Sequence, residues 1–103
     1  MVYYSEQAET DLDDIVVGML EWEKHDLTFE HIMSYRYDLK RACDALEMKH
    51  YHFPAEYPQH LEYGKYVLAY KRNPRTTWYI IYDIDEKGDI YINKIISNYL
   101  TQN

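Results

Sequence analysis

The chain of 103 residues contains one cysteine, three glycines and three prolines, and each scarcity excludes a class of structure. Because Cys43 is the only cysteine, no internal disulfide can form, and its helix-spaced apolar neighbours predict a buried, unreactive thiol in a reducing compartment. The three glycines form no phosphate-binding loop. No run approaches the ~20 apolar residues of a membrane span, and polar residues follow Met1–Tyr4 at once, without a signal-like pattern. We therefore expect a cytoplasmic protein.

Positive charge is scarce in the first part of the chain. The formal net charge is −7, and residues 1–61 hold 13 acidic against 5 basic side chains, whereas residues 62–103 hold 5 against 6. Seven acids and no base lie between Glu6 and Glu23. A solvated, acidic helix face is the plainest interpretation of this run, and it leaves a mildly basic second part for any contact with nucleic acid.

Apolar residues at helical spacing predict two long helices. The first runs from about Ser5, a suitable N-cap, to Lys24, and the second from Asp26 or Thr28 to about Lys49. A short link between two such helices predicts an antiparallel pair.

Three strand-like segments follow, over residues 62–72, 78–84 and 89–96, joined by turns at 73–76 and 85–88. The start of the chain, Met1 to Tyr4, adds a possible short strand. Both faces of 78–84 are apolar, which predicts a central strand with the helices on one side. We expect a single α+β domain over residues 1–103. It would consist of a short N-terminal strand, a helix hairpin and a three-stranded antiparallel meander, with the other side of the sheet free for a macromolecule.

Residues 50–61 contain two prolines, cannot continue a helix and predict an ordered loop. His50, His52 and His60 lie in it, and an H-x-H pair with a third histidine could bind zinc in principle. No cysteine supports such a site and the segment offers no fixed ligand spacing, so we expect neither a metal nor another cofactor.

Basic and tyrosine side chains alternate through the strand segments, and two interpretations of them stay open. Cations beside aromatic rings are typical of a nucleic-acid surface. Tyrosine is also a common strand residue, and lysine protects sheet edges from unwanted pairing. The basic group comprises Lys65, Lys71, Arg72, Arg75 and Lys94.

Two sequence patterns resemble the RelE/ParE toxin superfamily. Ala8-x-x-Asp11-Leu12-x-x-Ile15 is similar to its first-helix pattern, and residues 79–86 followed by 90–92 are similar to its central hairpin. The resemblance implies a RelE/ParE-like fold and the growth-inhibiting toxin of a type II toxin–antitoxin or plasmid-stabilisation system. Its partner would be a cognate antitoxin from a neighbouring gene. One branch of the family inhibits DNA gyrase by binding, and the other cuts ribosome-bound mRNA without a metal.

The chain departs from the RNA-cutting branch. Tyr79 stands where that branch has a strand arginine, and Ser97 and Asn98 stand where a base is usual. We therefore expect a ParE-like inhibitor that binds a target such as DNA gyrase. The alternatives are a RelE-like mRNA endoribonuclease or a non-toxic antitoxin-binding relative, so whether the chain is an enzyme stays open. If it is RelE-like, the resemblance implies phosphate contacts and proton transfer by the following residues: Lys71, Arg72, Arg75, Tyr79 and Tyr99.

Overall fold

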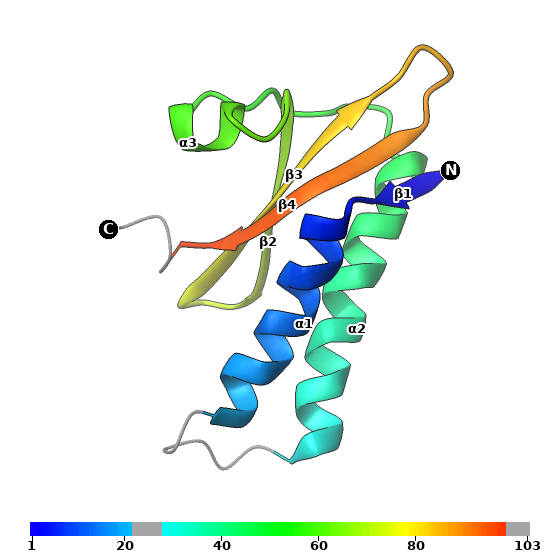
Figure 1. Ribbon diagram of the computed structural model, residues 1–103. Helices are drawn as coiled ribbons and strands as arrows, with labels where there is room; N and C mark the ends of the chain where they lie inside the picture. The colour runs from blue at the N-terminus through cyan, green and yellow to red at the C-terminus, as the bar shows by residue number, and fades with distance from the viewer. Residues whose placement is uncertain (22–27, 99–103) are drawn as a thin grey trace.

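The computed structural model describes residues 1–21 and 28–98, and within these ranges the chain has an α+β fold (Figure 1). Three α-helices accompany a four-stranded mixed sheet. In chain order the elements are β1 (Val2–Tyr4), α1 (Glu6–Glu21), α2 (Phe29–Asp44), a 3₁₀-helix (Ala45–Met48), α3 (Pro58–Leu61), β2 (Tyr66–Asn73), β3 (Thr76–Ile84) and β4 (Ile90–Ser97). No helix in the described ranges is long and apolar enough to cross a bilayer.

The predicted antiparallel helix pair is confirmed. Ser5 caps α1, because its hydroxyl accepts a hydrogen bond from the Ala8 N–H at 3.0 Å, and Thr28 caps α2 by accepting from the His31 N–H at 3.1 Å. The guanidinium of Arg36 lies 3.2 Å from the Asp13 carboxylate and ties the middle of α2 to α1. The predicted last turn of the first helix falls on residues 22–24, outside the described residues. The predicted last turn of the second helix is a 3₁₀-helix.

The predicted meander is confirmed, but the sheet as a whole is mixed. The strand order is β1-β4-β3-β2, and β1 runs parallel to β4. The predicted short N-terminal strand is present as β1, and its parallel pairing makes the sheet mixed. At the start of this pairing the Met1 ammonium lies 2.9 Å from Asp89 and 3.1 Å from Glu47, and the Ile90 N–H donates to the Met1 carbonyl at 2.9 Å.

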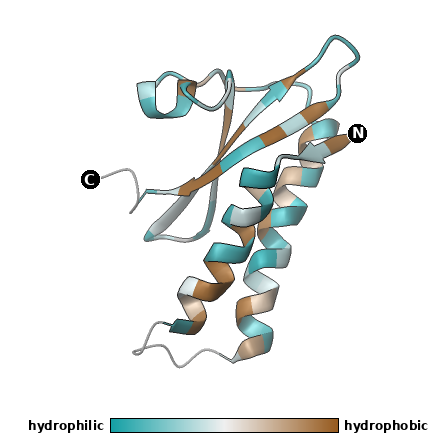
Figure 2. Cartoon of the chain, in the orientation of Figure 1, coloured by the Kyte–Doolittle hydropathy of each residue, from teal (hydrophilic) through white to brown (hydrophobic). Residues whose placement is uncertain are grey.

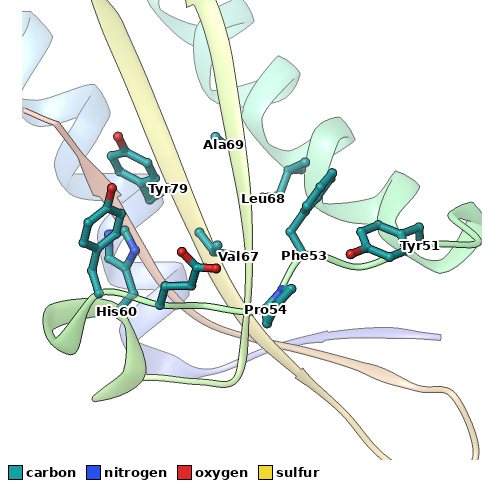
Figure 3. Close-up of a pocket in the computed structure, with 10 residues that line it drawn as sticks. Tyr51, Phe53, Pro54, His60, Val67, Leu68, Ala69 and Tyr79 are labelled. Carbon is teal, nitrogen blue, oxygen red and sulfur yellow. The ribbon is translucent and has the colours of Figure 1, made fainter.

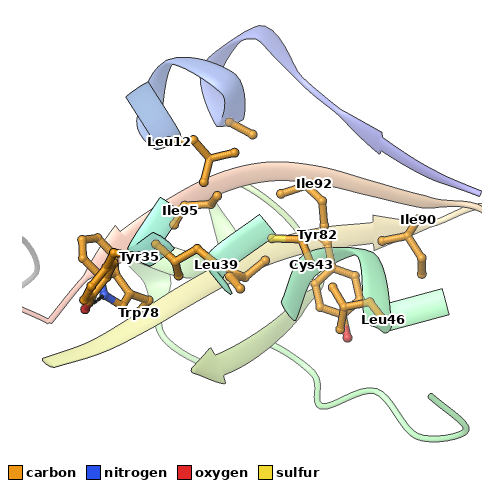
Figure 4. Close-up of a cluster of buried hydrophobic side chains, with 12 residues drawn as sticks. Leu12, Tyr35, Leu39, Cys43, Leu46, Trp78, Tyr82, Ile90, Ile92 and Ile95 are labelled. Atoms are coloured by element: carbon orange, nitrogen blue, oxygen red, sulfur yellow. Dashed lines mark hydrogen bonds between the residues drawn. The ribbon is translucent and has the colours of Figure 1, made fainter. Parts of the chain in front are cut away.

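The main core lies between the helix pair and one face of the sheet (Figure 4). Trp78 and Tyr35 belong to it, and the Trp78 indole N–H donates to the Tyr35 hydroxyl at 2.7 Å, so that both buried polar atoms are paired. Cys43 is fully buried here, as predicted, and burial raises the pKa of its thiol to about 12. The thiol therefore stays protonated and unreactive.

The segment predicted to be an ordered loop contains a one-turn helix, α3, at its end. Pro58 is at the start of α3, where the missing N–H costs nothing because the first amides of a helix lack partners within the helix. In Figure 1 the segment lies on the opposite side of the sheet from α1 and α2. Ile81 on this face is fully buried, and the backbone at Gly64 lies directly over it.

The face predicted to be free is therefore partly covered by the chain itself. The apolar pattern on both faces of β3 was the sequence signal for this cover, because exposed isoleucines in a central strand would leave a large apolar area in water.

A buried carboxylate joins α1 to the sheet. Asp11 is 7% exposed, and its oxygens accept from the Ile95 N–H at 2.9 Å, the Lys94 ammonium at 3.0 Å and the Gln7 amide at 2.8 Å. The paired residues of β1 end opposite Ile92, so Asp11 caps the part of the β4 edge that β1 does not reach.

Replacing Asp11 by alanine should lower the free energy of unfolding by about 2–3 kcal/mol, because it leaves a buried N–H and a half-buried ammonium without their acceptor. Asp13→Ala is the matched control. Asp13 is on the same helix, and its largely exposed ion pair should cost no more than about 0.5 kcal/mol. Urea unfolding measures the free energy of unfolding of both variants. Equal losses would contradict the conclusion that Asp11 joins α1 to the sheet.

Gly64 should tolerate no side chain. A Cβ there would lie 2.9 Å from the Tyr82 carbonyl oxygen and 3.1 Å from Ile81 Cγ2, neither of which can move freely. We expect Gly64→Ala to destabilise the fold by about 1–3 kcal/mol. Gly18→Ala, in the open surface of α1, should instead stabilise it by about 0.5–1 kcal/mol. Thermal unfolding measures both changes, and a neutral Gly64 variant would show that the segment does not rest on β3.

Candidate functional site

An apolar groove lies along the outer edge of β2, beside α3 (Figure 3). It encloses about 510 Å³, within the range of sites that hold a small molecule or an anchoring side chain. Its lining comes from the segment before α3, from α3 and from two strands. The residues are Tyr51, Phe53, Pro54, Glu56, Tyr57, His60, Val67, Leu68, Ala69 and Tyr79.

The groove forms where a neighbouring segment pairs with only part of the β2 edge. The Val67 N–H donates to the Phe53 carbonyl at 2.9 Å, and the Ala55 N–H donates to the Lys65 carbonyl at 2.7 Å. The chain then crosses to the far face of the sheet and forms α3. In Figure 3, Phe53 and Tyr51 lie on one side of β2, and Tyr79 and His60 lie on the other.

The remaining part of the β2 edge is open. Alternate residues of a strand direct their N–H and C=O groups to opposite sides, and Val67 directs its N–H away from β3. Ala69 and Lys71 follow the same alternation, and neither amide has a hydrogen-bond partner among the described residues. The groove thus borders backbone donors and acceptors available to another chain.

His60 is the only buried titratable group among the groove's lining residues. It is 2% exposed, and neither ring nitrogen has a hydrogen-bond partner in the described part of the chain. Its ring lies 4.8 Å from the Tyr79 ring and 5.5 Å from the Tyr57 ring, between centroids. Burial lowers the pKa of His60, so the ring is neutral and carries one donor and one acceptor. Unpaired buried polar atoms are costly in a folded protein, and a bound group could pair them.

Large aromatic side chains form the rim of the groove. Tyr51, Phe53 and Tyr57 are each more than 60% exposed, and the Tyr51 and Phe53 rings pack edge to face at 4.8 Å. Exposed aromatic rings beside a buried polar group are typical of a recognition site, because they bury a large area and lose little rotational freedom on binding.

The five residues that the resemblance implies for RNA cutting do not form one cluster. Lys71 and Tyr79 lie on the far face of the sheet, with Tyr79 against His60. Arg75 is exposed in the turn between β2 and β3, and Arg72 points to the helix side. Tyr99 lies outside the described residues.

Arg72 is held by α2. Its guanidinium donates to the Ser34 hydroxyl at 3.1 Å and lies 3.5 Å from the Asp38 carboxylate. It also covers the Tyr35 ring, 4.5 Å from the centroid. These contacts give Arg72 a structural role between the sheet and the helices.

The three histidines of the predicted loop do not converge. His52 Nδ1 lies 2.7 Å from the Tyr82 hydroxyl, on the helix side of the sheet, whereas His60 packs on Tyr79 on the far face. His50 is exposed. Residues 1–21 and 28–98 contain no group of three side chains placed to hold a metal ion.

The aromatic rim and the buried position of His60 were not predicted from the sequence. The sequence pattern indicated His60 only as a metal ligand, although Tyr51, Phe53 and Tyr57 precede it closely in the chain. That aromatic density beside two prolines was the available signal for a surface structure built to make contacts.

His60 should make stability depend on pH. Its pKa lies below the usual 6.5 in the folded state, so the unfolded chain binds more protons below about pH 6.5. The contribution of His60 to stability is present above that pH and is lost as the pH falls. His60→Gln should therefore show a smaller drop in melting temperature from pH 7.5 to 5.5 than the parent chain. His50→Gln, on the exposed part of the same segment, should leave this drop in melting temperature unchanged. Equal drops for the parent chain and both variants would contradict a buried neutral His60.

Comparison with known proteins found no matching family model, no matching curated protein and no matching solved structure.

Proposed function

We propose that the chain is a toxin-like protein of the RelE/ParE kind that acts by binding a macromolecular target such as DNA gyrase and is restrained by an antitoxin from a neighbouring gene. The proposal rests on the resemblance of the first helix and the central hairpin, together with the element order of strand, helix hairpin and meander.

The observation that carries the binding role is the amount of apolar surface left open. One such surface is the groove beside β2. The other is the end of the helix pair that projects beyond the sheet (Figure 2), where four apolar side chains are exposed: Val17, Leu20, Phe29 and Met33. Exposed apolar patches on a small protein are typical of protein contacts, and an antitoxin segment lying across both surfaces would cover them.

The positions of the basic residues support binding over cutting. Metal-free strand scission requires cations and a proton-transfer group around one phosphate. Arg72 is engaged with α2, on the opposite face from Lys71 and Tyr79. The acidic first part of the chain also repels ribosomal RNA.

Expression of the full chain in bacteria should slow growth, and co-expression with the adjacent small gene should restore it. Purified protein should reduce DNA supercoiling by gyrase. Translation-dependent cleavage of messenger RNA, lost in an Arg75→Ala variant, would instead support the RelE-like alternative. Unaffected growth together with stable co-purification of the neighbouring product would point to the non-toxic relative.

The Arg72→Ala variant tests whether Arg72 has a structural role between β2 and α2. Because the side chain holds β2 against α2, its loss should lower the free energy of unfolding by about 1–2 kcal/mol. Arg75→Ala, in the exposed turn, should change it by less than about 0.5 kcal/mol. Chemical denaturation separates the two. A stable Arg72→Ala variant that had lost activity would return this residue to a direct functional role.

A further inference from the structure

We propose that the groove beside β2 binds an extended peptide segment, which adds a strand along Ala69 and Lys71 and places a tyrosine hydroxyl on His60. The inference deepens the proposed function by naming how a partner chain is held. It rests on that function only in taking the occupant to be a partner protein.

The unpaired backbone groups on this edge can form hydrogen bonds with the backbone of another chain. Residues 53–55 already pair with the first part of β2, through hydrogen bonds of 2.7 and 2.9 Å, so the edge has the geometry to accept a strand. The pairing stops there, and the outward amides of Ala69 and Lys71 have no partner among the described residues. A short peptide beside them would continue the sheet and satisfy these groups.

The register of the added strand determines which of its side chains enters the groove. A residue directly opposite Ala69 shares its face of the sheet, which is the face of Tyr79 and His60. That side chain must extend across β2 to approach the histidine, because His60 packs against Tyr79 on β3. Ala69 is exposed and small, so it leaves this path open, and the crossing requires a long side chain.

The chemistry of the pocket selects a neutral aromatic group with a hydroxyl. A phenolic hydroxyl both donates and accepts, so it can pair with whichever nitrogen of neutral His60 faces it. The rings of Tyr57 and Tyr79 offer aromatic faces and edges to a third ring. A carboxylate would be disfavoured by the apolar lining and by Glu56.

The test uses the full chain labelled with ¹⁵N and a blocked pentapeptide with the sequence Lys-Thr-Tyr-Thr-Lys. Its lysines suit the acidic protein, and its central residue is varied to phenylalanine and alanine. We expect shifts and slowed hydrogen exchange at the Ala69 and Lys71 amides. The tyrosine peptide should bind about three- to tenfold more tightly than the phenylalanine peptide, as one hydrogen bond allows. Methylating the central amide nitrogen should weaken binding at least about fivefold.

Two variants and a matched control test the role of the pocket. His60→Leu should abolish the preference for tyrosine over phenylalanine, while His50→Leu should preserve it. Ala69→Ile, on an exposed strand position that favours β-branched residues, should block entry of the aromatic ring and remove binding of the tyrosine peptide. Thermal melts establish that each variant is folded.

Several outcomes would overturn the proposal. Equal binding of the tyrosine and phenylalanine peptides would refute the hydrogen bond to His60. Undiminished binding of the N-methylated peptide would refute the pairing with β2. Binding of p-cresol as tight as that of the peptide would assign the groove to a small molecule. A concentration-dependent dimer that protects the Ala69 amide would assign the edge to a second copy. The peptide assay requires no toxicity, so its failure is distinguishable from failure of the growth assay.

Discussion

The arrangement of this protein depends on the buried carboxylate of Asp11. One side chain on α1 accepts hydrogen bonds from the Ile95 N–H and the Lys94 ammonium, and it thereby fixes the helix pair against β4. Without that contact, β4 would present an unpaired backbone to water beyond the short strand β1. The ion pairs of Arg36 and the packing of Trp78 on Tyr35 then set the second helix on the first and on the sheet.

Local pattern was sufficient for the elements that form the main core. Apolar spacing identified both long helices, Ser5 and Thr28 supplied their caps, and the apolar residues on both faces of 78–84 indicated a central strand. The cover of the face opposite the helices was not predicted. A one-turn helix starting at Pro58 has too few residues for periodicity. Its position on β3 depends on the contact of His60 with Tyr79 and on the close approach of Gly64 to Ile81, which sequence spacing does not encode.

The candidate site was predictable only in part, for a related reason. The family resemblance singled out Arg72 and Tyr79, but no sequence pattern could show that the Arg72 guanidinium binds Ser34 and Asp38 on α2. Nor could any pattern show that His60 would be buried with no hydrogen-bond partner among residues 1–21 and 28–98. Long-range contacts decide which polar groups are paired within the fold and which stay available for another molecule.

The two edges of the sheet differ in how readily another strand can pair with them. One edge ends in β1, a strand of three residues, and in the Asp11 cap on β4 beyond it. The other edge is β2, a strand of eight residues whose outward amides at Ala69 and Lys71 have no partner among the described residues. A long edge strand with free backbone groups is a better template for pairing than a short one. The carboxylate on α1 thus removes a backbone donor from one edge, and strand addition is favoured at the other.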